Sequence, residues 1–370
     1  MFSTRFSDIL QALESIDIEG YGHTRNYLRG NVTRISPYIS RGVISTPMVL
    51  KYALRKNLPY AEVKPFLMEL CWRDYWQEIW MHDENMLLQP DHDTPTRDGM
   101  PQAVVKADTG IEAINRAILE LYETGYLHNH LRMYVAALVC NNAGCNWKTG
   151  ARWMHYHLLD ADPASNFLSW QWVAGLRNGK KYYANQENIN KYADTHQTNT
   201  YLDIPYDAFS KMQVPEVLKE TVTPSPITPL PVTKQPVFDH SRALAVYTPF
   251  HLDPRWLSTE PLNRVLLLPP SFFNKFPMAE KSLRFILDLA ANIEGIQVFT
   301  GECQDLLRCY PGKTIYFREH PMLKDLRGEF IQRPSVFPIY GFFPSFFAYW
   351  KQCEKFMKRH PDFLPELKSA

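Results

Sequence analysis

The 370-residue chain lacks several features that would assign it to a class of protein directly. Its six cysteines form no Cys-x-x-Cys pair and no Cys/His ligand set, which argues against a metal site and favours a reduced compartment. No window holds the roughly 18 apolar residues of a membrane span. Asp8 and Glu14 interrupt the apolar stretch that a signal peptide needs. We therefore expect a cytoplasmic protein without a metal.

The chain also carries almost no net charge, because 40 Lys and Arg residues balance 39 Asp and Glu residues. That balance predicts no overall attraction to nucleic acid, so such a partner has to be argued from a local site. Neither GxGxxG nor GxxxxGKS/T occurs, so the two common phosphate-binding loops are absent.

Aromatic residues, by contrast, make up 14% of the chain and include nine tryptophans. Most large aromatic side chains fill cores and interfaces. Seven of these tryptophans fall within about a hundred residues, which is better explained by a planar ligand: Trp72, Trp76, Trp80, Trp147, Trp153, Trp170 and Trp172.

The clearest boundary is a proline-rich segment near residues 214–238, which cannot lie inside a helix or a central strand. We expect three parts: a helical domain at 1–212, a linker at 213–238 and an α/β domain at 239–370. The predicted fold class is therefore all-helical followed by a smaller, Rossmann-like parallel α/β domain.

Periodicity supports that division. Apolar residues recur at helical spacing over 65–80, with Pro65 in the first turn, and over 109–125, with Thr109 and Gly125 as caps. A further helix is predicted from Tyr126, and no strand before residue 200. After the linker, short apolar runs of strand length occur together with one amphipathic helix, a pattern that is typical of a parallel sheet. The runs are 242–250, 264–270, 296–301 and 314–317.

Two polar clusters lie in the first half of the helical part. Thr33, Arg34 and Ser36 precede a helix predicted from Pro37, an arrangement that suits phosphate but also ordinary helix capping. Glu69, Trp72, Arg73 and Trp76 follow the i, i+3, i+4, i+7 rule and share a helix face. They could form a ligand site or a packed Arg–Glu pair.

Two more clusters follow. His128 and His130 diverge by about 200° on a helix, which argues against a shared metal, whereas Asn129 and Arg132 share a face. Asp160, Asp162 and Asn166 lead into Trp170 and Trp172. Carboxylates beside a turn are often caps, but polar groups beside indoles suit a flavin or a nucleobase.

Residues 20–200, which contain these clusters, resemble the helical flavin-binding domain of the DNA photolyase/cryptochrome family. Five motifs occur in the family's order: TRISPYISRG, FLMELCWRDYW, TGYLHNHLRMYVAALVCN, NWKTGARWM and LLDADPASNFLSWQW. The resemblance implies FAD as cofactor and leaves a second antenna chromophore unassigned.

The resemblance also implies residue roles. Contacts to the FAD diphosphate and ribityl chain are expected from Tyr21, Thr33, Arg34, Ser36, Phe66 and Arg73. The isoalloxazine and sugar would be lined by Asn129, Arg132, Asp160 and Asp162, with Asn166 facing flavin N5. Trp170 and Trp147 would be the inner electron donors. The flipped pyrimidine dimer would meet Arg25, Glu69, Trp72, Asn129, Met133 and Trp172.

Some features depart from the family pattern. Val32 replaces a threonine, Tyr126 replaces a tryptophan, and Thr94 stands where the outermost tryptophan of the electron chain is expected. Family members carry an α/β antenna domain before the flavin domain. Here the segments RALAVYTPFHLDPRW and RVLLLPPSFF resemble that domain but follow it, so we expect a swapped domain order.

The implied function is light-driven repair of cyclobutane pyrimidine dimers in DNA, a carbon–carbon lyase reaction driven by electron transfer from excited reduced flavin. We expect the protein to prefer single-stranded DNA that contains such dimers. Two alternatives stay open: a cryptochrome-like blue-light photoreceptor, and a non-catalytic protein that binds flavin or nucleic acid.

Overall fold

The computed structural model describes residues 2–89, 96–177, 179–310, 312, 314–323 and 326–365. These residues form two compact units. The first unit contains residues 1–19, 33–82 and 227–370, and the second contains 20–32 and 83–226. The units differ from the sequential division expected at the proline-rich segment, because helices before residue 83 pack with the C-terminal part of the chain. Thr94 lies outside the described residues.

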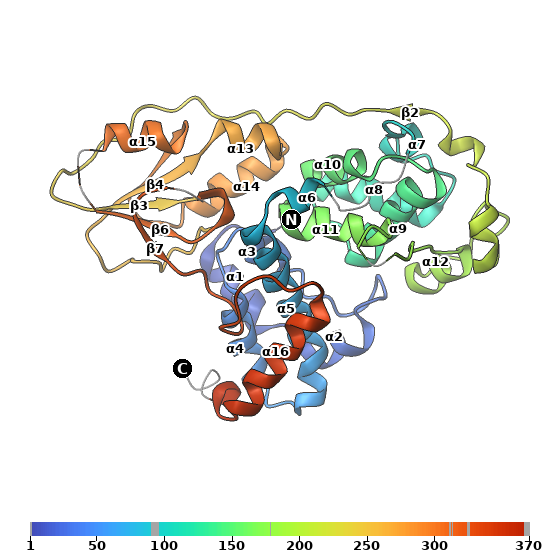
Figure 1. Ribbon diagram of the computed structural model, residues 1–370, viewed down its shortest axis with the longest axis horizontal. Coiled ribbons are helices and arrows are strands. Elements are labelled where there is room, and N and C mark those ends of the chain that lie inside the picture. The colour runs from blue at the N-terminus through green and yellow to red at the C-terminus, as the bar shows by residue number, and fades with distance from the viewer. Residues whose placement is uncertain are drawn as a thin grey trace. The chain divides into compact units, whose positions relative to one another are not determined.

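The α/β part of the first unit is a parallel sheet of five strands with the order β5-β4-β3-β6-β7 (Figure 1). Its elements are β3 (Leu244–Tyr247), β4 (Asn263–Leu268), α13 (Pro270–Lys275), α14 (Glu280–Ala290), β5 (Ile296–Thr300), α15 (Cys303–Cys309), β6 (Ile315–Arg318) and β7 (Glu329–Ile331). The predicted strands, the helix between them and the Rossmann-like order are confirmed. The short strand β7 was not predicted.

Apolar side chains fill both faces of this sheet. Leu244, Val246, Val265 and Leu267 alternate along β3 and β4 and pack in one cluster with α15 residues such as Leu306. The intervening residues of both strands are buried as well. Strands covered on both faces read as continuous hydrophobic runs, which is why their sequences lack alternation.

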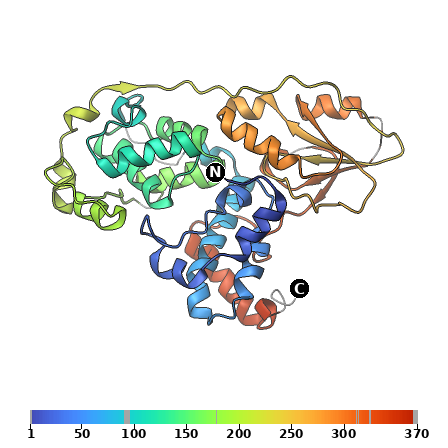
Figure 2. The ribbon, with the colours of Figure 1, turned by 180° about the vertical axis from the view of Figure 1, so that it is seen from behind.

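The remaining helices of the first unit are α1 (Phe6–Glu14), α3 (Ser36–Ser40), α4 (Thr46–Leu54), α5 (Tyr60–His82) and α16 (Phe346–Arg359). Helix α16 packs against α5, although their sequences are far apart (Figures 1 and 2). Pro65 is the sixth residue of α5 and not a first-turn residue, because the helix begins earlier than the apolar pattern indicates.

Aromatic and charged side chains join α3 and α5 to the sheet within this unit. Trp80 lies edge-on to Phe250 and to His320, with ring centroids 6.0 and 5.0 Å apart. Arg41 is fully buried and donates to the carbonyl oxygen of Pro249. Phe250 and His320 follow β3 and β6, where the strand order reverses and ligands of open α/β sheets usually bind. Protein side chains occupy that position here.

The second unit is mostly helical. Its helices are α2 (Ile18–Thr24, from Gly20 onward), α6 (Asn85–Leu88), α7 (Gln102–Val105), α8 (Glu112–Thr124), α9 (Asn129–Ala137), the π-helix Leu138–Asn142, α10 (Trp147–His157), α11 (Pro163–Val173) and α12 (Gln186–Ala193), followed by 3-10 turns at Tyr206–Lys211 and Glu216–Leu218. Two-residue strands β1 (Met100–Pro101) and β2 (Thr221–Val222) pair antiparallel, so one short strand, β1, lies before residue 200, where no strand was predicted.

Helix ends explain two further differences. Gly125 ends α8 in the left-handed conformation, with φ 70°, as expected for a glycine cap. Thr109 does not cap α8, which starts at Glu112; its hydroxyl instead accepts from the Ile111 backbone N–H. The next helix starts at Asn129 and not at Tyr126, because the side chain of His128 accepts from the His130 backbone N–H and caps it.

Candidate flavin and substrate site

The predicted site residues of the second unit include the buried carboxylate of Asp160, which pairs with Arg132. Arg132 on α9 donates to both oxygens of Asp160, with Nη2 to Oδ2 at 2.8 Å. A third bond from Arg132 Nε reaches the carbonyl oxygen of Leu127 at 2.9 Å. The guanidinium and the carboxylate, which leaves only 6% of its side-chain surface exposed, are therefore held in one orientation.

The turn after Asp160 is conformationally unusual. Ala161 is fully buried and has φ 21°, a region that L-residues rarely adopt. On its far side Asp162 caps α11, accepting from the Ser165 backbone N–H at 2.7 Å. The turn therefore sends the acids on either side of Ala161 in different directions, one to Arg132 and one to the helix start.

Asn166 lies one turn into α11 and is buried. Its amide Nδ2 donates to the carbonyl oxygen of Ala151 on α10 at 2.9 Å. That bond fixes the side chain and leaves the amide oxygen as an acceptor. The role of this amide facing a flavin nitrogen stays a prediction.

Both predicted inner electron donors are buried tryptophans of neighbouring helices. Trp170 on α11 and Trp147 on α10 each leave 2% of their surface exposed. Gly150 packs directly against Trp170, since a Cβ at residue 150 would lie 2.4 Å from the ring. Trp147 packs edge-on against Phe167, with ring centroids 6.4 Å apart.

The other predicted residues of this unit are more accessible. Asn129 is exposed, whereas Met133, Trp172, Tyr21 and Arg25 are half-buried. The Trp172 ring lies 6.0 Å from Tyr182, and the Arg25 guanidinium lies 5.9 Å from the Tyr21 ring. His130 Nδ1 donates to the carbonyl oxygen of Asn26 at 2.7 Å. No group of potential metal ligands occurs among the described residues.

The first unit holds the rest of the predicted flavin contacts. Arg73 Nη1 donates to the hydroxyl of Ser40 at 3.0 Å, so α5 and α3 are linked beside Ser36. Arg34 is exposed and has φ 52°, and Thr33 is half-buried, whereas Phe66 is buried in α5. Sequence reasoning missed Ser40, although it lies one turn after Ser36 in the same motif.

Glu69 and Trp72 lie half-buried on one face of α5, as predicted. The rings of Trp72 and Trp76 are 4.9 Å apart. The C-terminal helix adds a contact that the sequence did not suggest: Phe346 stacks on Trp72, with centroids 3.8 Å apart and planes within 10°. One face of the Trp72 ring is therefore occupied by a residue 274 positions later in the chain.

Behind this face α5 carries two buried acids. Asp74 accepts from the Thr46 hydroxyl at 2.9 Å and from the Val336 backbone N–H at 2.6 Å. Burial raises the pKa of Asp74 to about 6, although nearby Arg333 opposes the rise. Glu78 pairs with Arg333 and accepts from the Gly341 backbone N–H. These bonds fasten residues 333–341 to α5.

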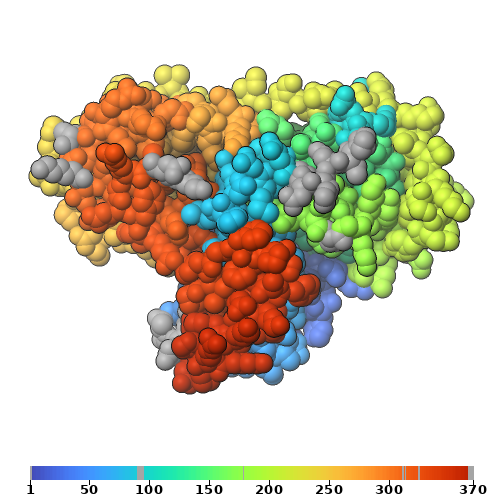
Figure 3. Space-filling view, viewed as in Figure 1, coloured from blue at the N-terminus to red at the C-terminus, as the bar shows by residue number. Residues whose placement is uncertain are grey.

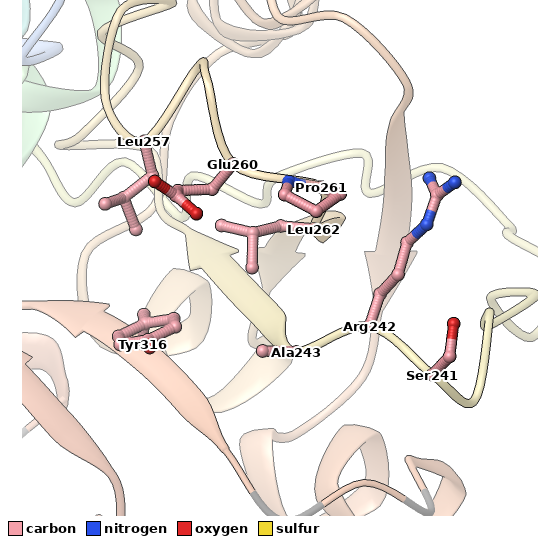
Figure 4. Close-up of a pocket in the computed structure, with 8 residues that line it drawn as sticks. All are labelled: Ser241, Arg242, Ala243, Leu257, Glu260, Pro261, Leu262 and Tyr316. Atoms are coloured by element: carbon pink, nitrogen blue, oxygen red, sulfur yellow. The ribbon is translucent and has the colours of Figure 1, made fainter.

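A hollow of about 660 Å³ opens in the α/β part of the first unit, at the starts of β3 and β4 (Figure 4). Leu262, Leu257 and Tyr316 contribute apolar surface, while the Arg242 side chain points away from them (Figure 4). None of its lining residues is a predicted site residue. It also lies at the edge of the sheet opposite to the one that open α/β folds use for ligands.

Comparison with known proteins matches the helical motifs. A family model described as the FAD-binding domain of DNA photolyase matches residues 66–216. The chain is 25% identical over 189 residues to a deoxyribodipyrimidine photo-lyase of Alkalihalophilus pseudofirmus, covering 45% of this chain and 36% of that protein. It is 30% identical over 199 residues to a cryptochrome DASH of Ostreococcus tauri, covering 51% and 35%.

Two other matches cover more of the chain. A deoxyribodipyrimidine photo-lyase of Agrobacterium fabrum is 26% identical over 283 residues, covering 65% of this chain and 57% of that protein. The solved class III photolyase of Agrobacterium tumefaciens is 20% identical, with a TM-score of 0.45 over 59% of this chain and 52% of that one. The chain thus spans between about a third and somewhat over half of the curated relatives it matches.

Residues 66–216 thus match a flavin-binding domain of the photolyase type, as the motifs predicted. FAD is the cofactor of that domain. The side chains present fit that group: Arg73 with Ser36 and Ser40 suits a diphosphate, and Asp160, Arg132 and Asn166 suit the polar parts of a flavin and its sugar. No described helix is long and apolar enough to cross a membrane.

Proposed function

We propose that the protein repairs cyclobutane pyrimidine dimers in DNA in a light-driven, FAD-dependent reaction. The observation that carries this proposal is the pairing of Glu69 with Trp72 on one face of α5, an acid and an indole at the positions where the family receives the dimer. When bound and reduced, FAD supplies under blue light the electron that opens the cyclobutane ring. The polypeptide supplies binding, orientation and exclusion of water.

The substrate-facing residues have distinct tasks. A dimer has to leave the base stack, which costs less than for an intact base because the damage weakens its pairing. Trp172 offers an indole for stacking, and Glu69 can accept a hydrogen bond from an imide N–H of the dimer. Asn129 and Met133 provide an amide and a thioether, neither of which can donate a proton as an acid. These residue types therefore favour a lesion whose repair needs no proton donor.

One observation favours a second function, that of a blue-light photoreceptor. Phe346 covers one face of Trp72, so that face cannot stack on a flipped pyrimidine. A photoreceptor needs the flavin and its electron donors but no open dimer pocket. The cover of Phe346 on Trp72 would then be a feature of signalling.

Illumination of fully reduced protein with a thymine-dimer oligonucleotide decides between these functions. We expect restored thymines, a lower repair yield for Glu69→Ala with flavin retained, and weaker substrate binding for Trp172→Ala by about 1–3 kcal/mol. Glu62→Ala, two turns earlier on α5, is the matched control and should repair normally. If neither single- nor double-stranded dimer is repaired, the repair function is wrong and the photoreceptor function takes its place.

A further inference from the structure

The C-terminal helix α16 has two chemically different faces. Phe346, Tyr349, Trp350 and Cys353 are buried, and through this face α16 packs on α5. On the other side Phe347, Lys351, Lys355 and Lys358 are exposed at i, i+4, i+8 and i+11. At 100° per residue these four side chains fall within an arc of about 80°, and we call them the basic stripe. Figure 3 shows the C-terminal segment, in red, at the molecular surface.

The stripe carries positive charge that the protein does not neutralise. Among the residues that the structure describes, none of its three lysines takes part in an ion pair. Glu354, the one acid of α16, is turned toward Lys64 at 3.4 Å. A chain with a net charge of only +1 therefore concentrates cations on one helix face.

Aromatic surface accompanies the charge. Phe347 leaves 68% of its surface exposed, more than any other described Phe, Tyr or Trp side chain. Tyr340 and Phe342, just before the helix, are 42% and 45% exposed, and Phe342 stacks on His82. An exposed ring followed by lysines along a helix is the combination that binds single strands, with bases on the ring and phosphates on the cations.

The stripe lies on the same helix as Phe346, the ring that stacks on Trp72. Four buried side chains and the bonds of Asp74 and Glu78 to residues 333–341 hold α16 in place. The helix is therefore a fixed part of the first unit.

A membrane is a poorer partner for this face. Interfacial helices insert a free apolar face into the lipid, whereas the apolar face of α16 is already buried against α5. Only the cations and one exposed ring remain for a partner, and both suit a flexible polyanion with planar groups.

We propose that the basic stripe binds the sugar–phosphate backbone of a single DNA strand beside the lesion, with one base stacked on Phe347. This inference rests on the proposed repair function for its choice of DNA. It assigns the binding of the DNA strand to the C-terminal helix and not to the nearly neutral protein as a whole.

The test uses the full chain and a fluorescein-labelled, undamaged single-stranded oligonucleotide, titrated at several salt concentrations. Each phosphate contact to a single strand contributes about 0.7 to the slope of log K against log salt. The variant Lys351→Gln/Lys355→Gln/Lys358→Gln should lower that slope by about two. Replacing three exposed lysines elsewhere in the same unit, Lys56, Lys234 and Lys281, by Gln should leave it unchanged. Phe347→Ala should weaken binding about tenfold at an unaltered slope.

Equal slopes for the stripe variant and the control variant would overturn the inference, as would absence of binding by the wild type. Thermal unfolding of each variant checks that its fold is kept. Tighter binding to anionic phosphatidylserine vesicles than to the oligonucleotide would also overturn it. Stripe-dependent binding without light-driven repair would retain this inference and overturn the repair function, whereas repair without stripe dependence would do the reverse.

Discussion

Asp160 shows how one residue can be tested for its role in cofactor binding. Its carboxylate holds Arg132 through two bonds in a largely buried setting, and a charged group in such a setting is costly to leave unpaired. The surface pair of Arg29 and Asp194, at 2.8 Å, has the same chemistry but is exposed. The two pairs therefore form a matched comparison.

We predict that Asp160→Asn weakens FAD retention by about 1.5–3 kcal/mol, because a charged acceptor is lost from the residues proposed to face the flavin. The dissociation constant can be measured from flavin absorbance after dialysis. Asp194→Asn keeps a residue type that tolerates the left-handed conformation and should retain FAD normally. Equal flavin affinity in the two variants would contradict the assignment of Asp160 to the site.

Trp170 allows a test of the electron chain. We predict that Trp170→Phe slows photoreduction of bound oxidised flavin at least tenfold, because phenylalanine keeps an aromatic ring but lacks the easily oxidised indole. Trp153 is an equally buried tryptophan of α10 whose Nε1 donates to Tyr122, and Trp153→Phe is the control. Similar photoreduction rates in Trp170→Phe and the wild type would mean that electrons reach the flavin by another route.

At the scale of elements, the close packing of α10 on α11 depends on one glycine. A Cβ at residue 150 would lie 2.4 and 2.5 Å from ring carbons of buried Trp170. Alanine is favoured over glycine in helices by about 1 kcal/mol, but overpacking a core typically costs 1–3 kcal/mol. The ring contacts are short enough for overpacking to dominate.

We therefore predict that Gly150→Ala lowers the free energy of unfolding by about 1–2 kcal/mol, measured by urea denaturation. Thr149→Ala, one residue earlier in the helix, should change it by less than about 0.5 kcal/mol. A stabilised Gly150→Ala variant would show that Trp170 can move aside and that helix propensity decides.

At the scale of the whole molecule, the buried acids of α5 couple stability to pH. Asp74 is buried, and its pKa rises from the usual 3.8 to about 6. The native state therefore binds the proton more tightly than the unfolded state. This contribution to stability is fully present below about pH 3.8 and is lost as the pH rises through 6.

We predict that the free energy of unfolding of the wild type, relative to Asp74→Asn, falls by about 3 kcal/mol between pH 3.8 and 7.5. Urea denaturation of both proteins across that range measures the difference. Asp83→Asn replaces an acid just after α5, and its free energy of unfolding should depend on pH as that of the wild type does. If the free energies of unfolding of the wild type and Asp74→Asn differ by the same amount at every pH, burial does not raise the pKa of this carboxyl.

Local patterns in the sequence were sufficient for most of the architecture. Helical periodicity located α5 and α8, continuous apolar runs located β3 to β6, and motif spacing brought out Asp160, Asn166 and Trp170, because these features depend on residues near one another in the chain. Helix ends were less well predicted, since Pro65 and Thr109 can each serve more than one position in a turn.

Contacts between distant segments were decided by the tertiary structure alone. Phe346 stacks on Trp72, and Arg333 pairs with Glu78 across 255 positions, so α5 is packed and fastened by the end of the chain. Nothing in either local sequence specifies its partner, because ring stacking and buried ion pairs depend on how separated elements meet. The sequence by itself determined the resemblance to a flavin-binding domain and the residue types of its motifs, and only the packing of α16 decided that one face of the Trp72 ring is covered.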